Sequence, residues 1–191
     1  MSEQSASVNK ALRKAADALA EAEALLITTG AGMGVDSGLA TYRGRNAGVW
    51  PPMGALGLDM SDLSTPRWFE VDPHLAWSFW RFRIEMYMRK SEPHEGYRIL
   101  ADWGESLPYG FFSVTSNIDG HWGRIIDESL IWEVHGAVTH SQLVDDDGRI
   151  WETDIEQILE LPTFEWDLEP GDRVKVREAT TGRSRGLRSP L

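Results

Sequence analysis

Apolar residues recur every three or four positions near the N-terminus, at Val8, Leu12, Ala15, Ala16, Leu19 and Ala22. This helical period predicts a helix over residues 7–23, with Ser7 capping its start. The apolar run at residues 24–28 follows directly and has the length of a buried strand. It breaks abruptly into a glycine-rich segment, residues 30–38, which predicts a sharp turn after the strand.

Proline marks three helix starts in the middle of the chain. Residues 65–66 (Thr-Pro) and 72–73 (Asp-Pro) each place a capping residue before a proline, which is favoured at the first helical position. The second pair predicts a long aromatic helix that ends at about Arg89. Pro93 predicts a further helix that ends near Trp103.

Two more apolar runs, residues 110–115 and 130–134, predict buried strands. Strands that alternate with helices in this order are typical of an α/β fold with a parallel sheet flanked by helices. Ligands of such sheets bind at the carboxyl ends of the strands. We therefore expect the loops at 29–44 and 116–120, together with His135, to converge on one candidate site.

The character of the sequence changes after His135. Residues 141–144 and 149–151 flank an Asp-Gly turn signal and predict a hairpin. The segment from about Arg173 onwards is rich in basic residues and is expected to be poorly ordered.

The composition of the 191-residue chain, 41% hydrophobic and 26% charged, is that of a globular protein. A formal net charge of −11 makes general nucleic-acid binding unfavourable, because an acidic surface repels phosphates. Cysteine is absent, which excludes disulfides, thiol nucleophiles, iron–sulfur clusters and thiolate zinc sites. No window approaches the roughly 18 consecutive apolar residues of a membrane span, and residues 1–8 lack a secretion-signal pattern. We therefore expect a cytoplasmic protein that binds neither nucleic acid nor membrane.

The glycine-rich loop does not match two common phosphate-binding patterns. The dinucleotide fingerprint would need a glycine where Val35 stands and an acidic residue about 20 positions later. The Walker pattern would need a Gly-Lys-Ser/Thr sequence, which does not follow. Taken alone, the loop fits either a nucleotide site or a turn without a ligand.

Three motifs, however, occur in the order and at the separations of one family. Residues 30–44, GAGMGVDSGLATYRG, resemble the first signature of the sirtuin (Sir2) family of NAD-dependent protein deacylases, and residues 48–50 resemble its following Gly-Leu-Trp. Residues 116–120, SNIDG, resemble the family's QNID-G loop, and residues 132–136, WEVHG, resemble its E-x-HG strand end. The resemblance spans roughly residues 24–140 and implies a Rossmann-like, sirtuin-type sheet.

The resemblance also implies a role for each matched residue. Asn117 and Asp119 would position the nicotinamide ribose and carboxamide, and His135 would act as general base on the ribose hydroxyls. Arg43 would close a flexible loop over NAD. The implied NAD contacts, of which the first three would hold the diphosphate, are Gly30, Ala31, Gly32, Gly34, Tyr42, Arg43, Trp50, Ser116, Asn117, Ile118 and Asp119.

The activity implied by the resemblance is NAD-dependent deacylation of protein lysine. In the family, the acyl-lysine oxygen attacks the nicotinamide ribose and expels nicotinamide, and the products include free lysine and acyl-ADP-ribose. One alternative keeps the same site in an NAD glycohydrolase or ADP-ribosyltransferase. Another is a non-catalytic NAD-binding or interaction module.

The sequence departs from the family pattern at several positions. Gly34 replaces a serine, and Ser116 replaces a glutamine whose longer amide could reach the ribose. The zinc-ribbon cysteines are missing, so no structural zinc is expected. No counterpart of the family's adenosine-holding loop follows Arg177, so we expect a sheet that is incomplete at its C-terminal end. An oligomer or a partner chain would then cover the open sheet edge.

Some bacterial sirtuins bind acidic acyl groups such as succinyl with a Tyr-x-x-Arg pair on a helix. Residues 80–83 resemble this pair, with Trp80 in place of the tyrosine and Arg83 as the carboxylate-binding residue. The alternative is a helix that packs its aromatic side chains and exposes its arginines.

His135 and His140 precede the acidic residues 145–147, so a metal site in this segment is conceivable. A solvated hairpin is favoured, because the spacing of these residues fits neither a calcium loop nor a zinc site.

The expected organisation has two parts. Residues 1–140 would form the sirtuin-type NAD-binding and catalytic domain, with a small helical insertion at about 50–103. Residues 141–191 would form a hairpin and a C-terminal extension in place of the zinc module.

Overall fold

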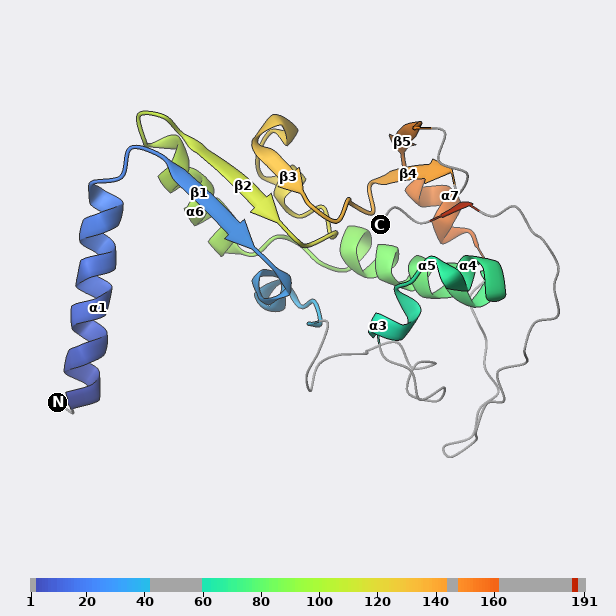
Figure 1. The fold of residues 1–191 in the computed structure, drawn as a ribbon, viewed down its shortest axis with the longest axis horizontal. Coiled ribbons are helices and arrows are strands. Elements are labelled where there is room, and N and C mark those ends of the chain that lie inside the picture. Colours follow the sequence, from blue (N-terminus) through green and yellow to red (C-terminus); the bar gives the residue numbers. More distant parts are fainter. Residues whose placement is uncertain (1–2, 42–59, 144–147, 162–186, 189–191) are drawn as a thin grey trace.

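The structure is a computed structural model that describes residues 3–41, 60–143, 148–161 and 187–188. Its first half contains helix α1 (Glu3–Ala20), strand β1 (Leu25–Thr29), the 3-10 helix η1 (Ala31–Ser37) and helices α3 (Met60–Leu63), α4 (Arg67–Val71), α5 (Pro73–Arg89) and α6 (Glu95–Glu105). Its second half contains β2 (Phe111–Thr115), η2 (Trp122–Arg124), η3 (Glu128–Leu130), β3 (Ile131–Glu133), β4 (His140–Leu143), β5 (Ile150–Glu152), α7 (Ile155–Leu159) and β6 (Leu187–Arg188) (Figure 1). None of the helices described is both long and apolar enough to cross a membrane.

The predicted parallel sheet is confirmed. Its strand order is β1-β2-β3, with Leu25 opposite Phe111 and Ser113 opposite Ile131. Both strand pairs are parallel, so all three carboxyl ends lie at the same edge of the sheet (Figure 1). The chain is therefore an α/β protein of the Rossmann-like kind, as the order of its elements predicts.

One face of this sheet is packed against α6. The cluster at that face combines Ile27 and Phe111 from the strands with Tyr97 and Ala101 from α6 and Trp122 from η2. Gly104 allows α6 to approach β2 closely, because a Cβ atom at this position would clash with the Phe111 ring. The residues that anchor this face also position the loops that follow β1 and β2.

A second hydrophobic cluster is built around the aromatic helix α5. Phe79 and Trp80 are almost completely buried there, and the cluster also takes side chains from α3, α4 and α7 and from the loop residues Ile118 and Val138. The start of α5 is fixed as predicted, because the Asp72 carboxylate accepts a hydrogen bond from the Leu75 N–H at 3.0 Å. The predicted end at Arg89 is also confirmed.

Several predicted boundaries were wrong. Helix α1 begins at Glu3, so Ser7 lies inside the helix and does not cap it. Helix α6 begins at Glu95 and not at Pro93, because the His94 ring accepts a hydrogen bond from the Gly96 N–H and forms the cap.

The segment after His135 contains both expected and unexpected elements. The predicted hairpin is confirmed by the antiparallel pairing of β4 with β5, with Ser141 opposite Trp151, although its tip at 145–147 lies outside the described residues. No pattern predicted α7 or β6. Residues 187–188 pair with β4 as β6, where the sequence predicts a poorly ordered end.

Candidate functional site

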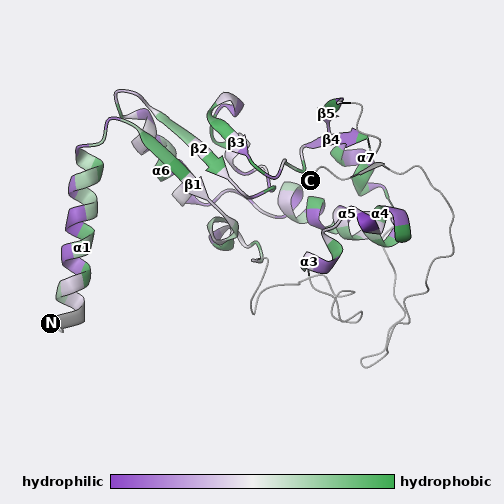
Figure 2. Cartoon of the chain, viewed as in Figure 1, coloured by the Kyte–Doolittle hydropathy of each residue, from purple (hydrophilic) through white to green (hydrophobic). Residues whose placement is uncertain are grey.

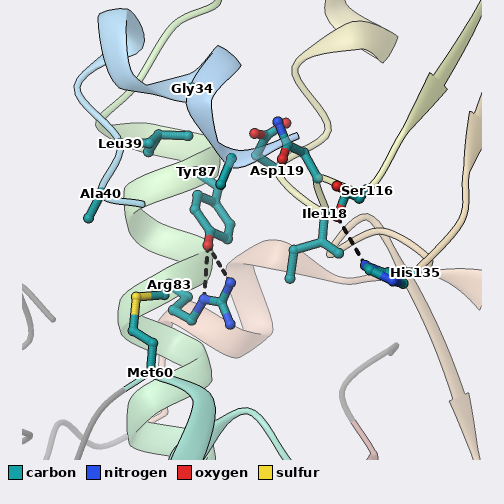
Figure 3. Close-up of a pocket in the computed structure, with 12 residues that line it drawn as sticks. Gly34, Leu39, Ala40, Met60, Arg83, Tyr87, Ser116, Ile118, Asp119 and His135 are labelled. Carbon is teal, nitrogen blue, oxygen red and sulfur yellow. Dashed lines mark hydrogen bonds between the residues drawn. The ribbon is translucent and has the colours of Figure 1, made fainter. Parts of the chain in front are cut away.

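The candidate site is a cavity of about 350 Å³ at the carboxyl ends of the parallel strands (Figure 3). Seven residues predicted for NAD binding or catalysis line it, namely Ala31, Gly34, Ser116, Asn117, Ile118, Asp119 and His135. They come from three separate segments of the chain, which the sheet brings together as the sequence predicts. Arg83, predicted for substrate binding, lines the opposite end of the cavity.

Six predicted site residues do not line the cavity or cannot be placed. Tyr42, Arg43 and Trp50 lie outside the described residues. Gly30 and Gly32 belong to the glycine loop but are not among the lining residues. The buried Trp80 packs in the α5 cluster, where its ring lies 4.8 Å from the Arg83 guanidinium carbon.

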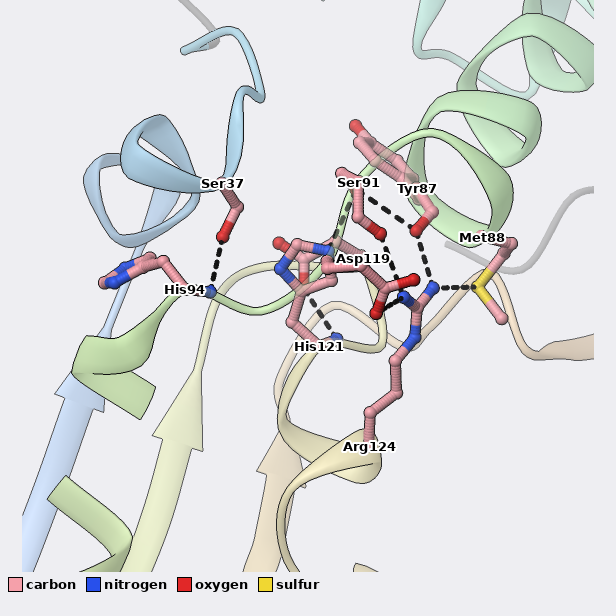
Figure 4. Close-up of polar contacts among 9 residues, drawn as sticks. Ser37, Tyr87, Met88, Ser91, His94, Asp119, His121 and Arg124 are labelled. Carbon is pink, nitrogen blue, oxygen red and sulfur yellow. Dashed lines mark hydrogen bonds and ion pairs between the residues drawn. The ribbon is translucent and has the colours of Figure 1, made fainter. Parts of the chain in front are cut away.

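The glycine loop is held in place from two sides. Gly38 ends η1 in the left-handed conformation, with φ of 83°, and its N–H donates to the Val35 carbonyl oxygen at 2.9 Å. His94 then ties the loop to the start of α6, because its backbone N–H donates to Ser37 Oγ and its Nε2 lies 2.9 Å from the Met33 carbonyl oxygen (Figure 4). The loop thus has a defined position beside the cavity.

The loop after β2 is locked to the glycine loop. The Asn117 side-chain amide donates to the Gly30 carbonyl oxygen at 3.0 Å, and the Asn117 N–H donates to Thr115 Oγ1. The nearly buried Asp119 carboxylate accepts a hydrogen bond from the His121 N–H at 3.0 Å. These bonds hold the polar side chains at the carboxyl ends of β1 and β2 before any ligand binds.

His135 lies at the exposed mouth of the cavity, directly after β3. Its Nδ1 lies 3.2 Å from the Ser116 carbonyl oxygen. Because a carbonyl oxygen can only accept, this hydrogen bond places a proton on Nδ1, so Nε2 is the acceptor nitrogen when the ring is neutral. The ring is therefore in the tautomer that a general base needs.

The Asp119 charge helps to raise the pKa of two neighbouring groups. Burial, followed by the charges of Asp119 and Glu128, raises the pKa of Glu133 to about 7. Burial and the Asp119 charge also raise the pKa of the Tyr97 hydroxyl well above its usual range. Glu133 is thus a carboxyl group that takes up a proton near neutral pH, two residues before His135.

Arg83 is not exposed, although a helix that packs only its aromatic side chains would expose its arginines. Only 4% of the Arg83 surface is accessible to solvent. Its Nε and Nη2 donate to the Tyr87 hydroxyl at 2.9 and 2.5 Å, and its Nη1 donates to Ser64 Oγ at 3.0 Å. These bonds orient a guanidinium group at the α5 end of the cavity (Figure 3).

Sequence reasoning missed four residues that line the cavity, namely Leu39, Ala40, Met60 and Tyr87. Tyr87 is the most informative of them, because it lies four positions after Arg83 and therefore on the same face of α5. An Arg-x-x-x-Tyr spacing in a predicted helix is the signal that could have found it.

The segment 121–124, which follows the loop of residues 116–120, connects the site to the end of α5 (Figure 4). The completely buried His121 has Nε2 3.0 Å from Ser91 Oγ, and its burial lowers its pKa, which favours the neutral ring. Arg124 donates to the carbonyl oxygens of Tyr87 and Ser91. These residues hold the helix that carries Arg83 in place relative to the loop that carries Asp119.

Comparison with known proteins is consistent with this arrangement. The family model described as Sir2 family matches residues 30–163. An NAD-dependent protein deacylase of Thermococcus kodakarensis is 30% identical over 185 residues, which cover 88% of this chain and 68% of the relative. The deacylase of Aquifex aeolicus is 32% identical over 60% of this chain and 44% of its own length, so the chain spans less than half of that relative.

Solved structures show the same fold. A crystal structure of a Sir2 homologue in complex with NAD has a TM-score of 0.62 at 23% identity and is matched over 79% of this chain and 53% of its own. A Sir2 homologue S24A mutant with ADP-ribose has a TM-score of 0.61 at 20% identity, over 91% of this chain and 59% of its own. At these identities the likeness establishes the fold and not the activity.

Proposed function

The chain belongs to the Sir2 family, and we propose that it acts as an NAD-dependent protein lysine deacylase. The observation that carries the proposal is the convergence of three loops on one cavity, with Asn117, Asp119 and the Nδ1-protonated ring of His135 among its lining residues. The relative from Thermococcus kodakarensis, which bears this activity in its name, matches 88% of the chain.

The residues around the cavity suit NAD as the co-substrate. A Cβ atom at Gly30 would lie 3.3 Å from Ser116 Oγ, so a larger residue would crowd the space between the two loops. The glycine loop would hold the diphosphate, and the fixed side chains of Asn117 and Asp119 would orient the nicotinamide ribose. NAD supplies an electrophilic ribose carbon whose leaving group is nicotinamide.

His135 would perform the proton transfer. When the ring is neutral, its Nε2 can accept the proton of a ribose hydroxyl and make that oxygen nucleophilic toward the acyl group. The Ser116 carbonyl oxygen accepts from Nδ1 and would stabilise the imidazolium that forms. The acyl-lysine oxygen would first displace nicotinamide from the ribose carbon. The activated hydroxyl oxygen would then bond to the acyl carbon, and addition of water would release free lysine and acyl-ADP-ribose.

The α5 end of the cavity supports an acidic acyl group as the preferred substrate. Arg83 is buried, and the hydroxyl groups of Tyr87 and Ser64 orient its guanidinium. A carboxylate at the end of a succinyl-type chain would pair with this fork. Tyr87 would fill the role of the tyrosine that Trp80 replaces, since its hydroxyl also faces Arg83 (Figure 3).

Nicotinamide release from NAD tests the proposed activity. The purified chain should release nicotinamide only with an acyl-lysine peptide present, and His135→Ala should abolish the release. His140→Ala is the matched control, because this second histidine is absent from the lining of the cavity and its Nδ1 bonds to Thr139 Oγ1.

Two results would contradict the proposed deacylase activity. Release that does not depend on the peptide would favour NAD hydrolysis or ADP-ribosyl transfer on the same site. NAD binding without turnover, unchanged by His135→Ala, would favour a non-catalytic module.

A further inference from the structure

The far end of the glycine loop is held by a single residue. Residues 31–37 form η1, and among the residues that the structure describes, every hydrogen bond from η1 to another element is made by His94, at the start of α6. Ser37 Oγ accepts from the His94 N–H at 3.0 Å, and the Met33 carbonyl oxygen lies 2.9 Å from His94 Nε2 (Figure 4). His94 therefore fixes where η1 lies beside the cavity.

The two bonds differ in what they require of the residue at position 94. The bond to Ser37 uses the backbone N–H, which every residue except proline would supply. The bond to Met33 uses the imidazole ring, which reaches from the start of α6 to the loop. Only the second bond therefore depends on histidine.

A third hydrogen bond holds the ring in one orientation. His94 Nδ1 accepts from the Gly96 N–H at 3.0 Å and so caps α6. Because a backbone N–H only donates and a carbonyl oxygen only accepts, Nδ1 is unprotonated and Nε2 carries the ring proton. Both nitrogens of the neutral ring are thus used, one for the helix and one for the glycine loop.

Gly96 leaves the space that this ring occupies. A Cβ atom at position 96 would lie 2.5 Å from His94 Cε1 and 2.9 Å from His94 Nδ1. Both distances are shorter than any real contact of a Cβ atom, so a side chain at position 96 would displace the ring. A substitution of Gly96 can therefore break the bond to Met33 without changing His94 itself.

Helix α6 is a firm anchor for the ring. Figure 2 shows β1 and β2 as largely hydrophobic strands, and Tyr97 and Ala101 of α6 belong to the buried cluster on these strands. Tyr97 also packs edge-on against the imidazole, with the ring centroids 5.1 Å apart. The position of His94 is therefore set by the same sheet that carries the site.

We propose that His94 is a positioning residue for NAD, which acts through the Met33 carbonyl group to hold the glycine loop in the arrangement that receives the diphosphate. The inference rests on the proposed function, which assigns NAD to this loop. His94 is absent from the lining of the cavity, so its effect on NAD is indirect. A loop that is ordered before its ligand arrives loses less conformational freedom on binding, so the bond strengthens NAD binding and leaves the chemical step unchanged.

Calorimetric titration of the full chain with NAD tests the proposal. His94→Ser keeps a good helix cap but is too short to reach Met33. The Kd for NAD should rise roughly twofold to tenfold, which is the range of one neutral hydrogen bond, while kcat at saturating NAD stays the same. His74→Ser is the matched control, because His74 is exposed in the first turn of α5 and does not line the cavity.

Gly96→Ala should weaken NAD binding as much as His94→Ser does. The higher helix propensity of alanine opposes the loss of the ring cap, so stability in urea should change little. In the double variant His94→Ser/Gly96→Ala, the second substitution should add nothing to the Kd, because no ring remains to be displaced. Increases that multiply in the double variant would overturn the proposal.

Amide hydrogen exchange without NAD separates this proposal from the proposed function. Exchange of residues 31–38 should be faster in both single variants than in the wild type, and exchange of β1 and α5 should not change. Unchanged exchange of the loop, or faster exchange with an unchanged Kd for NAD, would overturn the role of His94. A wild type that binds NAD without turnover would overturn the deacylase activity alone, and one that does not bind NAD would overturn both.

Discussion

The two ends of the cavity are built in different ways. At the strand end, Asn117, Asp119 and His135 sit on short loops, and hydrogen bonds between these side chains and backbone atoms hold each loop. At the helix end, Arg83 and Tyr87 sit on one face of α5 and are held by side-chain bonds among aromatic residues. Loops at strand ends can present reacting groups to a ligand, whereas a packed helix face selects a substrate by shape and charge. We therefore expect substitutions at the two ends to have separable effects.

Asp119→Asn should have the largest effect. The substitution removes a fixed charge at the strand end, so kcat/KM should fall on the order of 100-fold, a typical loss when one preorganised polar group is removed. The loss should be the same for acetyl-lysine and succinyl-lysine peptides, because Asp119 lies at the other end of the cavity from the acyl group. A loss confined to one peptide would contradict the separation of the two ends.

Arg83→Met should have the next largest effect and should act on one substrate class. Hydrogen bonds to a charged group contribute about 1.5–3 kcal/mol, so kcat/KM with a succinyl-lysine peptide should fall roughly 10- to 100-fold. The acetyl-lysine value should change little. Arg81→Met is the matched control, because Arg81 lies on the same helix but bonds to Glu85 and the Leu159 carbonyl oxygen and does not line the cavity.

Glu133, at the strand end of the cavity, should make the free energy of unfolding depend on pH. Its pKa of about 7 lies above its ordinary value of 4.5, so the folded state holds this proton more tightly than the unfolded state. The contribution of this proton to the free energy of unfolding is fully present below pH 4.5 and is lost as the pH rises to about 7. Glu133→Gln should therefore gain stability relative to the wild type between pH 4.5 and 7, as measured by urea unfolding.

The Asp119 charge contributes to that shift, so a double variant sharpens the test. In the Asp119→Asn background, the gain from Glu133→Gln should be smaller. An equal gain in both backgrounds would show that the two carboxyl groups do not interact.

Substitutions of Gly34 should have the smallest effect on kcat/KM. A Cβ atom there would lie 3.2 Å from Leu39 Cδ1 and 3.7 Å from Asp119 Oδ2, so both Gly34→Ala and Gly34→Ser require a small shift of Leu39. Only serine adds a hydroxyl beside Asp119. We expect Gly34→Ser to exceed Gly34→Ala in kcat/KM by less than tenfold, the range of one hydrogen bond. Equal values would show that this hydroxyl does not reach the carboxylate.

The strand end could be predicted from the sequence because its features are local. Each loop directly follows an apolar run of strand length, and parallel strands bring their carboxyl ends together regardless of the rest of the chain. Asn117 and His135 are therefore found beside the same cavity, as the motif order predicts.

The helix end could not be predicted to the same depth. Whether Arg83 faces solvent or the cavity depends on how α3 and α4 pack against α5, which spacing along one helix does not reveal. Met60 approaches the cavity from a segment without a recognisable motif. The apolar strands likewise predict burial, but periodicity does not show that one sheet face remains open.

The two ends of the cavity are best distinguished by kcat/KM for nicotinamide release by the wild-type chain, with matched succinyl-lysine and acetyl-lysine peptides. We predict release that depends on the peptide and a higher kcat/KM for the succinyl-lysine peptide, because one end of the cavity reacts and the other selects a negative charge. Release without peptide, or no release with either peptide, would contradict this prediction.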